Sequence, residues 1–211
     1  DVVDMCYWQQ LADGRLWAPP GDRNRAFREL NTEMFGRGVD TPPDATPLGV
    51  YRMVRDYRQR CPDKAIAAWH GGAGQVPVLM AGGAQVHLRN PAAGQSQGAT
   101  SDATPLDAFV RAHLARVLMH MEPRDGWFAD PEHVWCLADR AGSHVLVSSH
   151  AEHPIRLERA LPRPPQQALW LEVETGRTVA QDLPDGLAPG ATLPKPAEGA
   201  WLVLLRTVHE R

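Results

Sequence analysis

Aromatic and polar side chains that suit sugar binding stand at the ends of two apolar segments. Trp8 and Gln9 end the first segment, and Trp69 and His70 end the second. Indole rings match the apolar face of a sugar, and imidazole and amide groups can bond its hydroxyls. The two tryptophans could equally pack in a core, and His70 could be a packed or solvated loop side chain. Sugar contact and packing therefore both stay open for this group.

Further candidates lie in the loops that follow such segments. Trp17, Asp22 and Asn24 fall in a loop rich in Gly and Pro, and Arg89 and Asn90 follow a third apolar segment. Their rings and polar groups could hold a substrate. Asp22 or Asn24 could instead cap the helix that follows, and Trp17 could pack in its loop.

Other chemistries find less support in the sequence. His144, His150 and His153 are spaced like metal ligands, but no cysteine or further acid accompanies them closely, so we expect no metal site. The glycine-rich segment 71–74 lacks the Lys and Ser/Thr of a phosphate loop. We therefore expect no cofactor.

Composition limits the partners that this chain can have. Its 211 residues are 43% hydrophobic and 22% charged, with a formal net charge of −3, which is typical of a folded protein without a basic nucleic-acid face. No apolar run approaches the roughly 20 residues that span a bilayer. We expect neither a nucleic-acid partner nor a membrane partner. Three cysteines without close spacing make a disulfide scaffold improbable, while one pair stays open.

The first hundred residues alternate strand-like and helical segments. Residues 2–9, 64–69 and 85–88 are predicted strands, and Thr46-Pro47 is a strong helix start. This order predicts parallel strand–helix–strand units. A closed eight-stranded barrel takes about 250 residues. We therefore expect the last three units of an incomplete (β/α)8 barrel, in a chain that begins without Met and was cut or processed from something longer.

The rest of the chain predicts a capped helix and then an all-β region. Thr104-Pro105 followed by Asp107 forms a capping-box pattern before an apolar stripe that runs to Leu118. Short strands separated by turn residues then predict an antiparallel β-sandwich. The expected domains are a partial barrel over 1–103, a connecting helix over 104–125 and the sandwich over 126–211. The strands are expected at 134–137, 144–149, 155–158, 169–173, 177–180 and 201–206, and Trp127, Trp135, Trp170 and Trp201 are expected in the core.

Several segments together resemble the C-terminal part of apiosidase-like glycoside hydrolases, namely the end of the TIM barrel and the β-sandwich domain that is named for collagen binding. The chain departs from that pattern at Val173-Glu174, where the family tends to have Asp-Pro-Arg. The matching segments are 57–66 (YRQRCPDKAI), 79–88 (LMAGGAQVHL), 135–139 (WCLAD), 144–148 (HVLVS), 169–177 (LWLEVETGR) and 194–205 (PKPAEGAWLVLL).

This resemblance implies glycoside hydrolysis with two carboxyl groups, one after barrel strand four and one after strand seven. Strand four is absent here, and the predicted strand seven ends in Trp69-His70-Gly71 without an acid. No catalytic residue is assigned, so enzymatic activity stays open.

The expected function is the C-terminal portion of a glycoside hydrolase-like protein acting on polysaccharide, with part of the sugar cleft and an accessory β-sandwich. The alternatives are a non-catalytic module that binds carbohydrate or protein, and a sandwich that only supports the barrel. The expected partners are a polysaccharide or oligosaccharide and the missing N-terminal barrel segment. The resemblance implies a secreted or periplasmic location.

Overall fold

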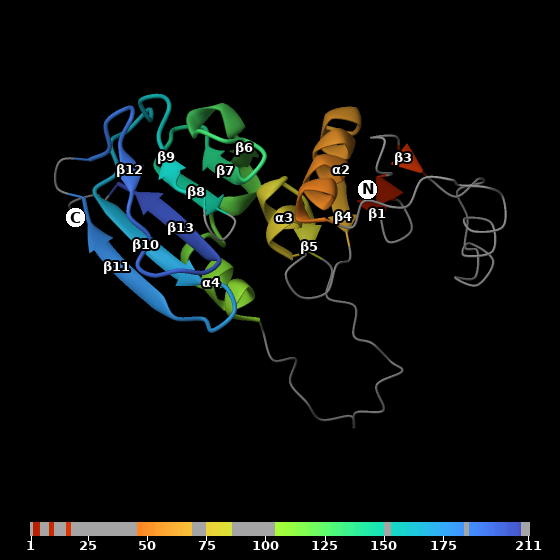
Figure 1. Cartoon of the computed structure of the whole chain (residues 1–211). Helices are drawn as coiled ribbons and strands as arrows, with labels where there is room; N and C mark the ends of the chain where they lie inside the picture. Colours follow the sequence, from red (N-terminus) through yellow and green to blue (C-terminus); the bar gives the residue numbers. More distant parts are fainter. Residues whose placement is uncertain are drawn as a thin grey trace, which may run out of the picture. The chain divides into compact units, whose positions relative to one another are not determined.

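Two units make up the chain, Asp1–Leu88 and Arg89–Arg211, and each is described by itself. The computed structural model describes residues 2–4, 9–10, 16–17, 46–68, 75–85, 104–149, 153–183 and 186–207 (Figure 1). Among these residues, no helix combines the length and the apolar character that crossing a membrane requires.

The first unit contains an open parallel sheet of three strands. Its order is β1 (Val2–Asp4), β4 (Ala65–Ala68) and β5 (Ala84–Gln85). Both pairings are parallel, with Val3 opposite Ile66 and Ala67 opposite Ala84. The predicted parallel strands are confirmed within the described residues. Within the described residues these strands do not close into a barrel.

Helices separate these strands along the chain. α2 (Pro47–Arg60) begins at Thr46, whose side chain accepts a hydrogen bond from the Gly49 amide at 3.1 Å, as the Thr-Pro pattern predicts. α3 (Gln75–Met80) precedes a tight turn into β5. In that turn, a Cβ on Gly83 would lie 2.9 Å from the Val54 side chain, so the close approach to α2 requires glycine there.

A six-stranded antiparallel sheet dominates the second unit, in the order β11-β10-β13-β8-β7-β6 (Figure 1). The antiparallel prediction is confirmed by the pairing of every neighbouring strand. A separate antiparallel pair, β9 with β12, lies beside it in the same unit. The bounds are β6 (Met121–Pro123), β7 (Val134–Asp139), β8 (His144–Ser149), β9 (Ile155–Arg156), β10 (Gln167–Glu172), β11 (Thr178–Asp182), β12 (Thr192–Leu193) and β13 (Trp201–Arg206).

The four central strands of this sheet are buried on both faces. One face packs on a core that includes Ile155 and Leu193 of the β9–β12 pair. The opposite face holds further buried side chains, such as Leu146 and Leu204. This two-sided burial explains why these strands are continuous apolar runs rather than alternating patterns. Trp135, Trp170 and Trp201 are buried as predicted, and Trp127 packs against the core while half-buried.

α4 (Pro105–His113) carries the predicted capping box. Thr104 Oγ1 accepts from the Asp107 amide at 3.2 Å, and Asp107 Oδ2 accepts from the Thr104 amide at 3.0 Å. The helix start lies against the β10–β11 turn, because a Cβ on Gly176 would be 3.1 Å from Pro105.

Two details of this region differ from the predictions. The apolar stripe was expected to stay helical to Leu118, but α4 ends at His113 and a short 3-10 helix, η3 (Leu118–His120), follows. Leu114 caps the helix outside helical geometry and is fully buried, so the stripe reaches the core without a continuous helix. The sheet also begins earlier than expected, with β6 in the segment assigned to the connecting helix.

The described cysteines carry free thiols. Cys61 is half-buried, and burial raises the pKa of the Cys136 thiol well above its usual value. Cys6 lies outside the described residues. Cys136 belongs to the core of the second unit, so its role is packing.

Candidate functional site

The structure brings two of the predicted sugar-binding residues together. Gln9 lies in β2 (Gln9–Gln10) and Trp17 in β3 (Leu16–Trp17), and the two residues are direct partners in this antiparallel pair. Trp17 therefore lies in a strand, in a segment for which the sequence predicts a loop. The other predicted residues lie outside the described part of the chain, namely Trp8, Asp22, Asn24, Trp69, His70, Arg89 and Asn90.

Topology nevertheless fixes where the chain leaves the parallel sheet. The carboxyl ends of β1, β4 and β5 point to one edge because these strands run in the same direction. The β2–β3 pair follows β1 along the chain, and β2 contacts α2. The predicted sugar-binding residues follow these strand ends in the sequence. Their position at that edge of the sheet therefore stays a prediction.

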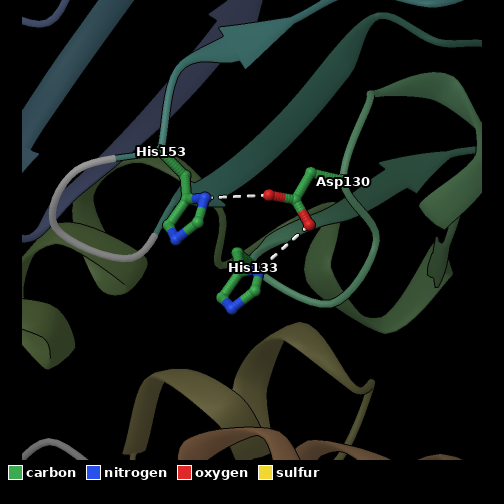
Figure 2. A group of neighbouring side chains, drawn as sticks. All are labelled: Asp130, His133 and His153. Carbon is green, nitrogen blue, oxygen red and sulfur yellow. Dashed lines mark hydrogen bonds and ion pairs between the residues drawn. The ribbon is translucent and has the colours of Figure 1, made fainter.

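A cluster of two histidines and one carboxylate stands out in the second unit (Figure 2). His133 Nδ1 lies 2.9 Å from Asp130 Oδ1, and His153 Nδ1 lies 2.8 Å from Asp130 Oδ2. The imidazole rings stack with centroids 3.9 Å apart and planes 4° apart. One carboxylate therefore organises both rings.

Local backbone geometry positions Asp130 and His133. They lie in the turn that enters β7, where the His133 and Val134 amides donate to the Asp130 carbonyl at 3.0 and 2.8 Å. Asp130 has a φ of 61°, a left-handed conformation that Asp tolerates better than most residues. The turn therefore projects both side chains within reach of each other.

Tertiary contacts bring His153 to this turn. The Ala129 amide donates to the Arg156 carbonyl at 2.9 Å, which joins the segment before Asp130 to β9. The Ser149 hydroxyl donates to the His153 carbonyl at 2.5 Å, which holds the backbone at the entry to β9. The cluster is thus anchored by backbone bonds on both of its sides.

Electrostatics keep the Asp130 carboxyl ionised. The hydrogen bond from His133 is the largest cause that lowers the pKa of Asp130, and the charges of His133 and His153 act in the same direction. Burial opposes this shift but does not outweigh it. The three side chains are 38–42% exposed, so small solutes can reach them.

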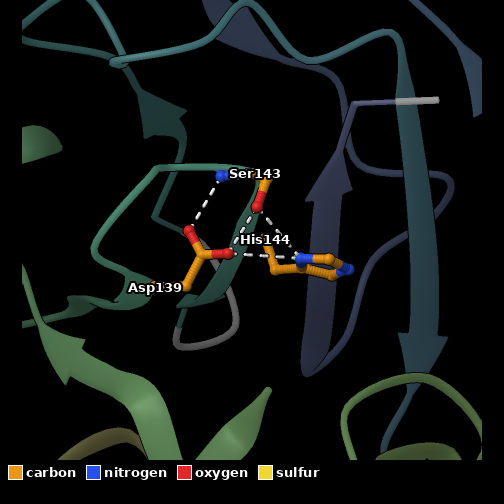
Figure 3. A network of polar contacts seen from close by, with 3 residues as sticks. All are labelled: Asp139, Ser143 and His144. Carbon is orange, nitrogen blue, oxygen red and sulfur yellow. Dashed lines mark hydrogen bonds and ion pairs between the residues drawn. The ribbon is translucent and has the colours of Figure 1, made fainter. Parts of the chain in front are cut away.

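A second cluster, Asp139, Ser143 and His144, has the residue types of a serine hydrolase triad (Figure 3). In such a triad the histidine stands between the serine and the acid. Here the Ser143 hydroxyl donates directly to Asp139 Oδ2 at 2.5 Å, while His144 Nδ1 lies 3.3 Å from the same oxygen. The serine proton is directed to the carboxylate, so this geometry stabilises the β7–β8 turn and does not activate a nucleophile.

Sequence reasoning grouped the histidines differently. It considered His144, His150 and His153 together, whereas the structure pairs His144 with Asp139 and joins His153 to His133 and Asp130. His150 lies outside the described residues. The Asp-x-x-His spacing at 130–133 is a local signal that sequence reasoning overlooked, but no local signal points to His153.

The sequence also contains one esterase-like motif. Residues 94–98 (GQSQG) match the Gly-x-Ser-x-Gly spacing of a nucleophile elbow. That motif needs a strand directly before it, and here Asn90-Pro91-Ala92-Ala93 precedes it. The segment lies outside the described residues, so it stays a weak pattern.

Comparisons with known proteins give one family match over the first part of the chain and a structural match over most of it. A family described as "Domain of unknown function (DUF6298)" matches residues 1–102. None of the curated proteins matches this chain. Among the solved structures, a chain titled "Glycoside hydrolase" matches with a TM-score of 0.50 and 13% sequence identity.

That structural match covers 90% of this chain and 50% of the glycoside hydrolase. The chain thus spans about half the length of the matched structure. At this identity the similarity is one of fold. The mixed parallel and antiparallel architecture described above therefore resembles part of a glycoside hydrolase.

Proposed function

We propose that this chain is the C-terminal portion of a glycoside hydrolase-like protein that acts on polysaccharide. The observation that carries the proposal is the fold: three parallel strands joined by helices, then an antiparallel unit, in a chain that resembles half of a glycoside hydrolase over 90% of its length. The first unit would supply part of the sugar cleft and the second an accessory β-sandwich. A secreted or periplasmic location fits such a substrate.

Three strand ends converge where the cleft would lie. In a (β/α)8 barrel the active site is at the carboxyl ends of the strands. β1 is followed by Trp8, β4 by Trp69 and His70, and β5 by Arg89 and Asn90. The indole rings would stack on the sugar, and the polar groups would bond its hydroxyls.

The β2–β3 pair adds a second wall to this cleft. Gln9 and Trp17 are direct partners in it, so an amide and an indole occupy neighbouring backbone positions. Asp22 and Asn24 follow β3 along the chain and would extend the polar lining. Missing barrel strands from the remaining half of the protein would complete the cleft and bring the catalytic carboxyl groups.

We further propose domain limits of 1–103 for the barrel part and 126–211 for the sandwich, with 104–125 connecting them. The connecting segment is tied to the sandwich, because its β6 pairs with β7. The sandwich has its own core, which supports treating it as a separate accessory domain.

Sugar binding by the full-length encoded protein tests this proposal. Plant cell-wall and bacterial polysaccharides on a glycan array would identify a bound sugar, and calorimetry would then compare Trp69→Ala and His70→Ala with the wild type. We expect both variants to bind roughly 5- to 30-fold more weakly, since lost stacking or hydroxyl bonding costs about 1–2 kcal/mol. His120→Ala is the matched control, because His120 is exposed and lies in the second unit.

Melting temperatures separate a cleft role from a packing role. A cleft role predicts weaker binding with little change in melting temperature. A large fall in melting temperature with unchanged affinity of the folded fraction would place both side chains in a core and contradict the proposal.

A non-catalytic carbohydrate-binding module is the second candidate. The observation in its favour is that no Asp or Glu follows β4 before α3, since residues 69–74 read WHGGAG. Release of reducing ends from a bound polysaccharide would establish the enzyme. Binding of the same polysaccharide without release would establish the module.

A further inference from the structure

We propose that Asp130, His133 and His153 form a binding site for a divalent transition-metal ion of the zinc type. The site lies in the second unit and goes beyond the proposed action on carbohydrate. Its ligand atoms all lie within 4.8 Å of one another.

The donor set fits this class of ion. Two imidazole nitrogens and one carboxylate oxygen are ligands that Zn²⁺ and similar ions accept, and three protein ligands leave one position open. Figure 2 shows all three side chains converging, with both Nδ1 atoms directed at the Asp130 carboxylate. Once the two rings tilt apart, an ion between them and the carboxylate would receive all three donors.

Each imidazole can present its Nδ1 atom to an ion. Without an ion, each Nδ1–H donates to the Asp130 carboxylate, at 2.9 Å from His133 and 2.8 Å from His153. A neutral histidine can move its proton to Nε2, which leaves a lone pair on Nδ1 for the ion. The ion then takes the place of the two N–H protons, and the carboxylate balances part of its charge.

The stacked rings must open for the ion to enter. A bound ion lies close to the plane of each imidazole, about 2.0–2.1 Å from its nitrogen. Two parallel rings 3.9 Å apart do not share such a position. Because both rings are about 40% exposed, tilting them apart rotates surface side chains and leaves the core unchanged.

Backbone contacts between the two segments favour binding once the rings tilt. The turn at Asp130 and the β9 segment are joined by the Ala129–Arg156 hydrogen bond and by the bridge between Phe128 and Leu157. An ion would therefore cross-link segments that are already adjacent, with little loss of backbone entropy. Binding to the folded state alone also raises stability.

Metal titration of the whole chain tests the site. The protein is stripped with a chelator, and ZnCl₂ is titrated by calorimetry while CoCl₂ is followed by its visible absorption. We expect one saturable site per chain, with a cobalt spectrum of low coordination number. His133→Ala, His153→Ala and Asp130→Asn should each weaken binding by roughly tenfold or more, since each removes one of three ligands.

The chain contains nine histidines, and exposed ones can bind metal ions weakly. His120→Ala removes one exposed histidine outside the cluster and serves as the control for such adventitious binding. It should bind Zn²⁺ like the wild type. Circular dichroism of the metal-free variants checks folding, and Asp130→Asn keeps the side-chain shape if the alanine variants are unstable. Absence of saturable binding, or equal affinity in the wild type and the folded ligand variants, would overturn the proposal.

Discussion

Asp139 shows how one carboxylate organises a turn. Its Oδ1 accepts from the Ser143 amide at 2.8 Å, and its Oδ2 accepts from the Ser143 hydroxyl. Burial of this carboxyl would raise its pKa, but the hydrogen bonds from Ser143 and His144 outweigh burial and hold the pKa of Asp139 below its ordinary value. The ionised form of Asp139 therefore stabilises the folded state.

Substitution of Asp139 by Asn should make this contribution visible as a pH dependence. A folded-state pKa below the unfolded value of about 3.9 gives stability that is fully present above about pH 5 and is lost as the pH falls through the folded pKa. We expect Asp139→Asn to lower the free energy of unfolding by about 1–2 kcal/mol at pH 7 and by less at pH 3. Urea unfolding at both pH values measures this, and an equal loss at both would show that the charge plays no part.

At the scale of elements, the two described helices with side-chain caps begin in different ways. α4 has a reciprocal capping box, in which Thr104 and Asp107 each accept from the other's amide. α2 has a single cap bond from the Gly49 amide to Thr46 and no acid in its first turn. The two starts therefore provide a comparison within one protein.

The reciprocal box should contribute more than the single cap. We expect Thr104→Ala to destabilise the protein by about 1–2 kcal/mol and Thr46→Ala by about 0.5–1 kcal/mol. Hydrogen exchange of the first-turn amides, together with urea unfolding, measures both effects. Thr104→Ser should restore most of the loss, and equal effects at Thr104 and Thr46 would argue against a contribution from Asp107.

At the scale of the whole molecule, the two units protect their sheet edges differently. The edge strands of the six-stranded sheet are β6, which contains Pro123, and β11, which ends at Asp182. Pro and charge on edge strands oppose pairing with another chain. Among the described residues of the first unit, β1 and β5 pair only with β4; β1 ends at the charged Asp4, whereas β5 contains neither Pro nor a charged residue.

This difference predicts self-association through the first unit when the 211-residue chain is prepared alone. In the proposed incomplete barrel the β5 edge has no partner strand within this chain, so a second copy should pair with it or the chain should aggregate. Light scattering at increasing concentration measures this, with the fragment 89–211 as control. A monodisperse monomer of the whole chain at all concentrations would contradict the incomplete-barrel interpretation.

The sequence by itself determined the elements whose causes are local. Thr46-Pro47 and Thr104-Pro105 defined helix starts because their side chains cap amides within the next three residues. Strands such as β8 and β13 were predicted at their observed bounds because their apolar runs suit burial on both faces.

Only tertiary structure decided the features that join distant segments. β6 and β12 are two or three residues long and exist through their pairing partners, so no local pattern marks them. Tertiary contacts also decide that His144 and His153 belong to different clusters. Backbone hydrogen bonds between the Asp130 turn and β9 bring His153 to the Asp130 carboxylate. A side-chain cluster depends on where the chain returns in space, and spacing along the sequence does not contain that information.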